Sequence, residues 1–146
     1  MKSPINPIQS DKASTKKTLD QLVSLLAAGS LPTAVRRKSF IVNDVPHALS
    51  ITTDENMLAT VLGSILHTVV CHTENSCIRI AANVYDKIVQ VSMQDSSNCF
   101  NSDVVANELQ QVQALAEKMG GYLSMNSKLQ KVTSIAFSFP NLPQAA

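Results

Sequence analysis

The sequence contains no tryptophan, only 4% aromatic residues and only 16% charged residues. With so few aromatic rings it lacks the stacking surfaces that bind single-stranded nucleic acids. A formal net charge of +1, with "VRRK" at 35–38 as the largest basic cluster, also argues against a nucleic-acid partner. No apolar run reaches the ~18 residues that cross a bilayer, and "MKSPINPIQS" lacks the apolar core of a signal peptide. We therefore expect a cytoplasmic protein without membrane contact.

The cysteines, Cys71, Cys77 and Cys99, are odd in number and irregular in spacing. Together with His67 and His72 they invite a metal interpretation. Zinc sites, however, usually show paired short spacings such as C-x-x-C, which are absent from this sequence. No serine or cysteine lies in the sequence context of a known nucleophile either. The pattern favours reduced, metal-free and mostly buried thiols.

At 146 residues the chain is long enough for one domain with a sizeable core. Residues 1–13 carry two prolines and no hydrophobic periodicity, which is typical of a flexible linker. The expected domain covers residues 14–143, and residues 144–146 form a short tail.

Hydrophobic periodicity predicts the secondary structure. The predicted helices span 15–28, 54–72 and 103–119, and the predicted strands span 39–45, 48–52, 77–85, 87–94, 122–127 and 133–140. Leucine and valine on the first helix are expected in the core, with a partner-binding surface as the alternative. Helices separated by pairs of strands indicate a two-layer α/β sandwich, with a mixed, mostly antiparallel sheet and about three helices on one face.

The helix over 54–72 is the best-defined element. Asp54 is a good N-cap residue, and the following apolar residues form one wide helical stripe. The stripe consists of Met57, Leu58, Val61, Leu62, Ile65, Leu66, Val69 and Val70.

The run "SFIVNDVPHALSITTDENMLATVLGSILHTVVCHT", followed by "ALAEKMGGYLSMNS" and "TSIAFSFP", resembles the ATP-binding domain of sensor histidine kinases. The resemblance covers residues 17–142 in order. It implies the ATPase fold shared by gyrases, chaperones and histidine kinases, and a place in bacterial two-component signalling. It also implies a pocket whose motifs can be compared residue by residue.

The first family motif is a pair of asparagines four residues apart on the long helix, the second of which holds Mg²⁺. Ser64 and Thr68 stand at those positions, and His72 follows on the same side of the helix. A threonine hydroxyl can ligate Mg²⁺, but it is shorter than the amide that the family uses. We expect no metal, with Thr68 as the ligand if Mg²⁺ binds.

The second motif of the family is Asp-x-Gly-x-Gly, in which the aspartate binds the adenine amino group. Asp95 is kept, whereas Ser97 and Cys99 replace the two glycines. The third motif is a glycine-rich segment that holds the phosphates at a helix N-terminus. The corresponding "VVANEL" contains no glycine and carries Glu108, whose carboxylate would repel a triphosphate. The alternative role for Asp95 is that of an ordinary turn aspartate.

The resemblance and its departures predict a degenerate, non-hydrolysing ATPase-like domain that acts by protein–protein interaction. Its expected partners are dimerising phosphotransfer helices, a response regulator or another signalling protein, and no cofactor is expected. Two alternatives stay open: a divergent but functional domain that binds ATP and Mg²⁺, and a stand-alone regulator like the anti-sigma-factor kinases. None of His47, His67 and His72 lies in the context of a phospho-accepting histidine. Whether the chain belongs to an active enzyme is therefore left open by the sequence.

Overall fold

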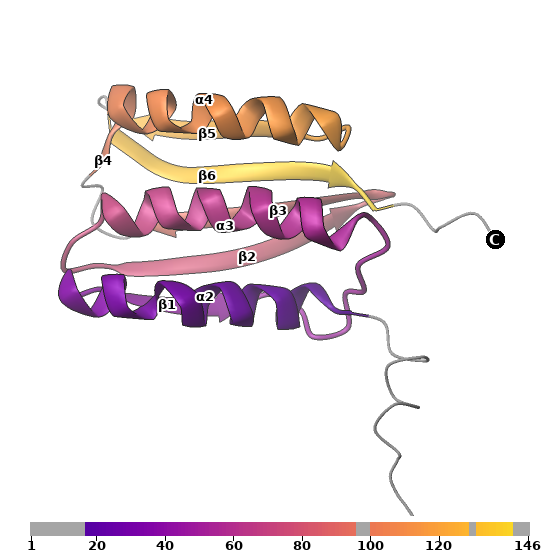
Figure 1. Ribbon diagram of the computed structural model, residues 1–146, viewed down its shortest axis with the longest axis horizontal. Helices are drawn as coiled ribbons and strands as arrows, with labels where there is room; N and C mark the ends of the chain where they lie inside the picture. Colours follow the sequence, from indigo (N-terminus) through magenta and orange to yellow (C-terminus); the bar gives the residue numbers. More distant parts are fainter. Residues whose placement is uncertain (1–16, 96–99, 129–130, 142–146) are drawn as a thin grey trace, which may run out of the picture.

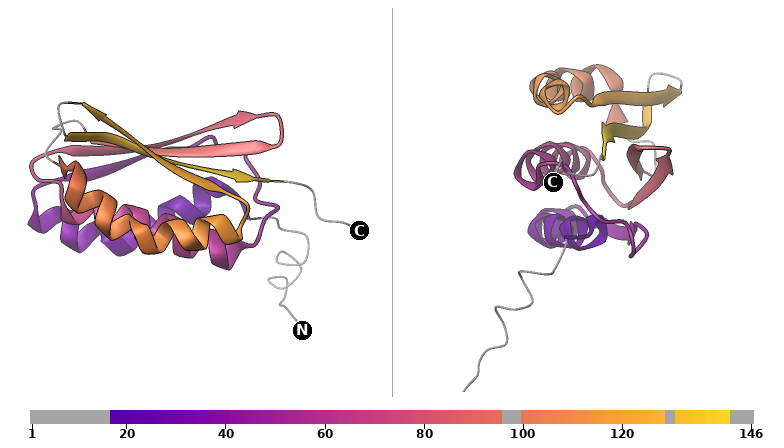
Figure 2. Two further views of the ribbon diagram at one scale, coloured as in Figure 1. Left: turned by 90° about the horizontal axis from the view of Figure 1, so that it is seen from above. Right: turned by 90° about the vertical axis from the view of Figure 1, so that its right-hand side faces the viewer.

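The computed structural model describes residues 17–95, 100–128 and 131–141. The predicted linker over 1–13 and the tail over 144–146 lie outside these ranges. Three helices lie within these ranges: α2 (Leu19–Arg36), α3 (Glu55–Cys71) and α4 (Ser102–Lys118). They lie side by side with α3 in the middle (Figure 1), and the sheet covers one side of this helical layer (Figure 2).

The strands form one mixed sheet. They are β1 (Phe40–Asp44), β2 (Cys77–Tyr85), β3 (Ile88–Asp95), β4 (Phe100–Asn101), β5 (Tyr122–Lys128) and β6 (Lys131–Pro140). β1 and β2 are parallel, and every other pairing is antiparallel, with β6 joined to β3, β4 and β5. The predicted two-layer sandwich, with a mostly antiparallel sheet and helices on one face, is confirmed.

The core lies between the two layers and centres on α3. Asp54 caps this helix by accepting hydrogen bonds from the backbone N–H groups of Asn56 and Met57, at 2.9 and 3.2 Å. All of the predicted stripe residues except Met57 are buried. On the sheet side, the rings of Phe137 and Phe139 stack with their centroids 5.3 Å apart. The helix prediction over 54–72 is confirmed to within one residue at each end.

The first helix differs from its prediction over 15–28. It begins later, because Thr18 and Gln21 form a capping box. It also continues past Gly29 and accommodates Pro32 in its interior. The additional turns bury Ala34 completely, and this tertiary contact outweighs the backbone hydrogen bond that a proline removes. "AAGS" therefore does not end the helix.

The predicted strand over 48–52 is wrong. Only Ser50 forms an isolated bridge, to Thr18. The flanking backbone groups bond instead to the start of α2 and the residues just before it. The Leu49 carbonyl accepts a hydrogen bond from the Leu19 N–H, and the Ile51 N–H donates to the Lys17 carbonyl, both at 2.9 Å. Pro46 and a turn precede this segment and separate it from β1.

The side chain of Asn141 links the segment over 48–52 to the end of the sheet by hydrogen bonds. Its Oδ1 accepts from the Thr52 N–H at 2.8 Å and from the Thr52 hydroxyl at 3.0 Å, and its Nδ2 donates to the Ser50 carbonyl at 2.9 Å. Asn141→Ala removes all three side-chain bonds, so we expect the free energy of unfolding to fall by about 1–3 kcal/mol. Urea denaturation measures this loss. Gln113→Ala, which removes a single solvent-exposed side-chain bond to Glu117, is the matched control, and equal losses in the two variants would contradict the prediction.

Candidate functional site

An open cleft of about 620 Å³ lies between α3 and α4. The side chains that line it come from successive turns of the two helices, at spacings of three or four residues. The described lining residues are Ala59, Thr60, Gly63, Ser64, His67, Thr68, Asn107, Glu108, Gln111 and Val112. The nucleotide pocket predicted from the sequence corresponds to this cleft, because Ser64, Thr68 and Glu108 line it.

The structure brings four of the predicted site residues together. Ser64, Thr68 and Glu108 line the cleft. His72, the C-cap residue of α3, contacts Glu108 of α4 with 2.8 Å between Nε2 and Oε2. Both side chains are partly exposed. The pair joins the two helices across the end of the cleft, so the carboxylate of Glu108 is engaged by a protein side chain.

Thr68 is buried, and its hydroxyl donates to the Ser64 carbonyl of its own helix at 3.0 Å. The donor capacity of this hydroxyl is therefore used within α3. Its oxygen keeps lone pairs that could accept a hydrogen bond or ligate a cation, although a threonine reaches less far into the cleft than the family's asparagine would.

Asp95 is not among the described residues that line the cleft. Its side chain is buried, with Asp95 only 4% exposed, and one carboxylate oxygen accepts a hydrogen bond from the hydroxyl of Ser76. Ser76 is also buried and lies just before β2. The strand register explains the contact, because Ile78 of β2 is paired with Asp95 of β3. The predicted neighbours Ser97 and Cys99 lie outside the described residues.

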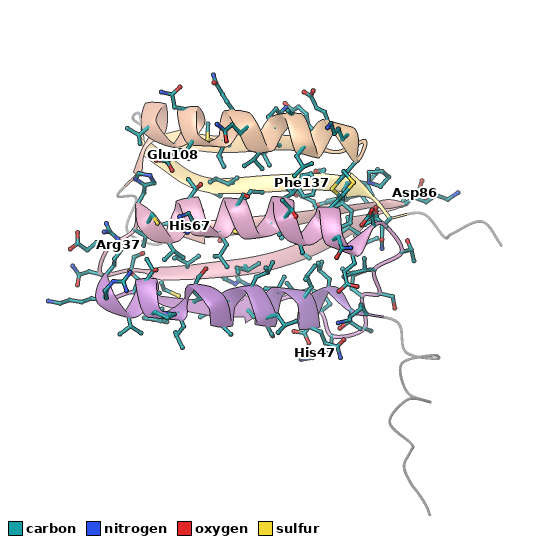
Figure 3. All side chains as sticks on the ribbon, viewed as in Figure 1. Arg37, His47, His67, Asp86, Glu108 and Phe137 are labelled. Atoms are coloured by element: carbon teal, nitrogen blue, oxygen red, sulfur yellow. The ribbon has the colours of Figure 1, made fainter. Side chains whose placement is uncertain are left out.

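Four polar residues of the cleft were missed by the sequence analysis: Thr60, His67, Asn107 and Gln111. Thr60 and His67 lie four and three positions from Ser64, and this spacing is the signal that would have identified them. Asn107 and Gln111 lie one position before and three positions after Glu108 on α4. Figure 3 shows His67 on α3 and Glu108 on α4 at the same end of the helical layer. Nε2 of His67 lies 3.5 Å from the sulfur of Cys71.

The described lining of the cleft carries no permanently cationic side chain. Its described lining contains a carboxylate, an imidazole, hydroxyls and amides, but no lysine or arginine. Phosphates in proteins are usually held by cations, by glycine-rich backbone or by helix N-termini. The polar groups that are present can hydrogen-bond an uncharged or cationic group.

The thiols offer no alternative centre within the part of the chain that the structure describes. Cys71 and Cys77 are both half-buried. No group of three or more histidine, cysteine, aspartate or glutamate side chains in the described ranges is arranged to hold a metal ion. Cys99 lies outside those ranges, and the reduced, metal-free state of all three thiols stays a prediction. In the described residues no helix has the length and apolar character needed to cross a membrane.

Comparison with known proteins identifies the fold. No protein-family model and no curated protein sequence matches the chain. Among solved structures, full-length ShkA in complex with AMPPNP has a TM-score of 0.74 at 22% identity over 90% of this chain, which spans only 32% of ShkA. The Acinetobacter baumannii histidine kinase AdeS has a TM-score of 0.74 at 10% identity, with 87% of this chain and 66% of AdeS covered.

The catalytic domain of histidine kinase ThkA matches over nearly its whole length. Its TM-score is 0.68 at 16% identity, and the match covers 87% of this chain and 95% of that domain. The same three helices on one face of a mixed sheet thus recur in catalytic domains of histidine kinases. The chain has the fold of a histidine kinase ATPase domain.

Proposed function

We propose that this domain is a degenerate histidine-kinase-type ATPase domain that works by protein–protein interaction in bacterial two-component signalling, without ATP turnover. The observation that carries the proposal is the cleft between α3 and α4. Its described lining has no lysine or arginine, and Glu108, which stands where the resemblance places the phosphate-binding segment, pairs with His72. The fold is that of a nucleotide-binding domain, whereas these side chains disfavour the binding of a triphosphate.

The environment of Asp95 also supports the proposal. The carboxylate of Asp95, the counterpart of the family's adenine-binding group, is buried against Ser76. The polar side chains Ser64 and Thr68 face a cleft to whose described lining Asp95 does not contribute. The burial of this carboxylate and its hydrogen bond from Ser76 support a structural role for Asp95.

The proposed partners are other signalling proteins in the cytoplasm. ThkA has been crystallised in complex with the response regulator protein TrrA. A response regulator, or the dimerising phosphotransfer helices of a kinase, is accordingly the class of partner we propose for this domain. No cofactor is part of the proposed function.

Isothermal titration with Mg-ATP tests the proposal. Each lost charge-assisted hydrogen bond to phosphate costs about 1.5–3 kcal/mol. Two or three such losses convert micromolar affinity into millimolar or weaker affinity. We therefore expect no saturable heat of binding at ~1 mM Mg-ATP and no release of phosphate.

ShkA, whose structure contains AMPPNP, is the positive control for the titration. Backbone NMR shifts of this chain, recorded in parallel, report on Thr68 and Glu108 directly. Saturable shifts at both residues with micromolar Mg-ATP would contradict the proposal. They would favour the alternative, in which the domain is divergent but binds ATP and Mg²⁺, with Thr68 as the metal ligand.

A further inference from the structure

Strand β1 forms one edge of the sheet and lies behind α2 in Figure 1. Among the described residues it has a ladder partner, β2, on one side only. Phe40 N–H donates to the Ser76 carbonyl at 3.1 Å, so the backbone groups of Phe40, Val42 and Asp44 point toward β2. In a parallel ladder the intervening residues point the other way. The N–H and C=O groups of Ile41 and Asn43 therefore face outward from the edge.

Apolar side chains flank this edge on the open face of the sheet. Phe40 is 59% exposed and Val42 is 38% exposed, and they share one face of β1 because they are two residues apart. The strand also lacks the usual protection of an edge, since Phe40–Asp44 contains no proline, lysine or bulge. Such an edge is a template for another strand.

Helix α2 continues the apolar surface on the other side of the edge. Ser24 accepts a hydrogen bond from Asn43 Nδ2 at 2.9 Å, which places this side of the helix against β1. Leu31 and Val35 lie seven and eleven residues further along, on the same side of the helix. Leu31 is exposed, and Val35 is 62% exposed. The surface formed by Leu31, Val35, Phe40 and Val42 is called the β1 edge surface below.

We propose that the β1 edge surface is a homodimer interface, in which β1 pairs antiparallel with β1 of a second copy about a two-fold axis through Val42. In this register Ile41 lies opposite Asn43 of the partner subunit. These residues carry the outward backbone groups, so each such pair exchanges both of its hydrogen bonds. Val42 then lies opposite Val42 of the partner subunit, at a non-hydrogen-bonded position of the ladder, where the two side chains are close together.

The charges at the two ends of β1 complement each other in this arrangement. The strand begins beside the basic run Arg36–Lys38 and ends at Asp44, whose half-exposed carboxylate also pairs with Arg79 of the same chain. Antiparallel pairing brings the basic end of one copy next to Asp44 of the partner subunit, whereas parallel stacking would place like charges together. α2 also carries Asp20 in its first turn and Arg36 in its last, and the two copies of this helix would run antiparallel.

A second copy fits this surface better than a foreign strand does. The outward backbone groups of Ile41 and Asn43 lie on either side of Val42, so a second copy of β1 can pair with all of them about one two-fold axis. A stable interface covers ~800 Å² on each partner. A five-residue strand alone is too small for that, and the exposed side of α2 supplies the additional apolar area.

Sedimentation of the full chain over roughly 1–100 µM tests the proposal. We expect the wild type to reach twice the chain mass of 15.7 kDa. Val42→Lys places two like charges opposite each other and should raise the dimer dissociation constant at least ~10-fold. Val42→Glu should do the same. An equimolar mixture of the two variants should recover the dimer, because each lysine then faces a glutamate across the axis.

Val84→Lys is the matched control, since Val84 is 52% exposed on β2, near the turn to β3. It should leave the dimer unchanged, and circular dichroism should show that every variant is folded. A wild type that stays monomeric to ~100 µM would overturn the proposal. So would a Val42→Lys variant that dimerises as the wild type does, or a Lys/Glu mixture that stays monomeric.

Discussion

Leu62→Ala should lower the free energy of unfolding by about 2–5 kcal/mol, and Ile65→Ala should have an effect of similar size. Both side chains are buried on the middle helix of the layer, α3, between the flanking helices and the sheet. Truncation removes apolar contacts and leaves a cavity that neighbours on several sides cannot all relax to fill. This is the largest effect that we expect from a single core substitution.

Chemical denaturation followed by circular dichroism measures the change, with the midpoint and slope fitted separately. Leu25→Ala is the matched control, because it makes the same truncation at an exposed position of α2 and should change stability by less than about 0.5 kcal/mol. If Leu62→Ala and Leu25→Ala had equal effects, α3 would not occupy the centre of the core.

The second large effect is expected at Asp95. Asp95→Ala should reduce the free energy of unfolding by about 2–4 kcal/mol, because it leaves the buried hydroxyl of Ser76 without this acceptor. Ser76→Ala should also destabilise the protein. The double variant should lose less than the sum of the two single losses, since both remove the same interaction.

The same variants distinguish structure from nucleotide recognition at Asp95. If the carboxylate serves the fold, Asp95→Asn keeps an acceptor for Ser76 and should recover part of the lost stability. Any weak binding of adenosine should be equal in wild type and Asp95→Asn. A variant with wild-type stability that loses measurable adenosine binding would show instead that Asp95 reads the base.

Local patterns in the sequence predict the elements whose ends depend on local chemistry. α3 has its cap in Asp54 and its stripe in one continuous run. The helix α4 ends where glycine is needed, because Gly120 has a φ of +75°. A Cβ on Gly121 would lie only 2.7 Å from Phe137 Cε1 and from the Ser138 carbonyl oxygen. The glycine pair thus combines a left-handed turn with a close approach to β6.

Features that depend on tertiary contacts were not predictable in the same way. α2 extends beyond Gly29 because Ala34 reaches the core, and no property of residues 15–28 indicates this. The bond between Ser76 and Asp95 joins residues 19 positions apart, and it requires the register of β2 and β3. Asn107 and Gln111 have the pattern of surface residues on α4, and only the position of α3 makes them part of a cleft.

The placement of β6 has a consequence for how the chain acquires its structure. β6 is the last strand in the described sequence, yet it joins β3 to β5 within the sheet. Asn141 just beyond it bonds residues 89 and 91 positions earlier. During synthesis, β1, β2 and β3 must therefore wait for residues 131–141 to leave the ribosome before the sheet is complete. Until then the edge of β3 that pairs with β6 lacks its neighbour, and a chain interrupted before residue 131 would be a substrate for chaperones and proteases.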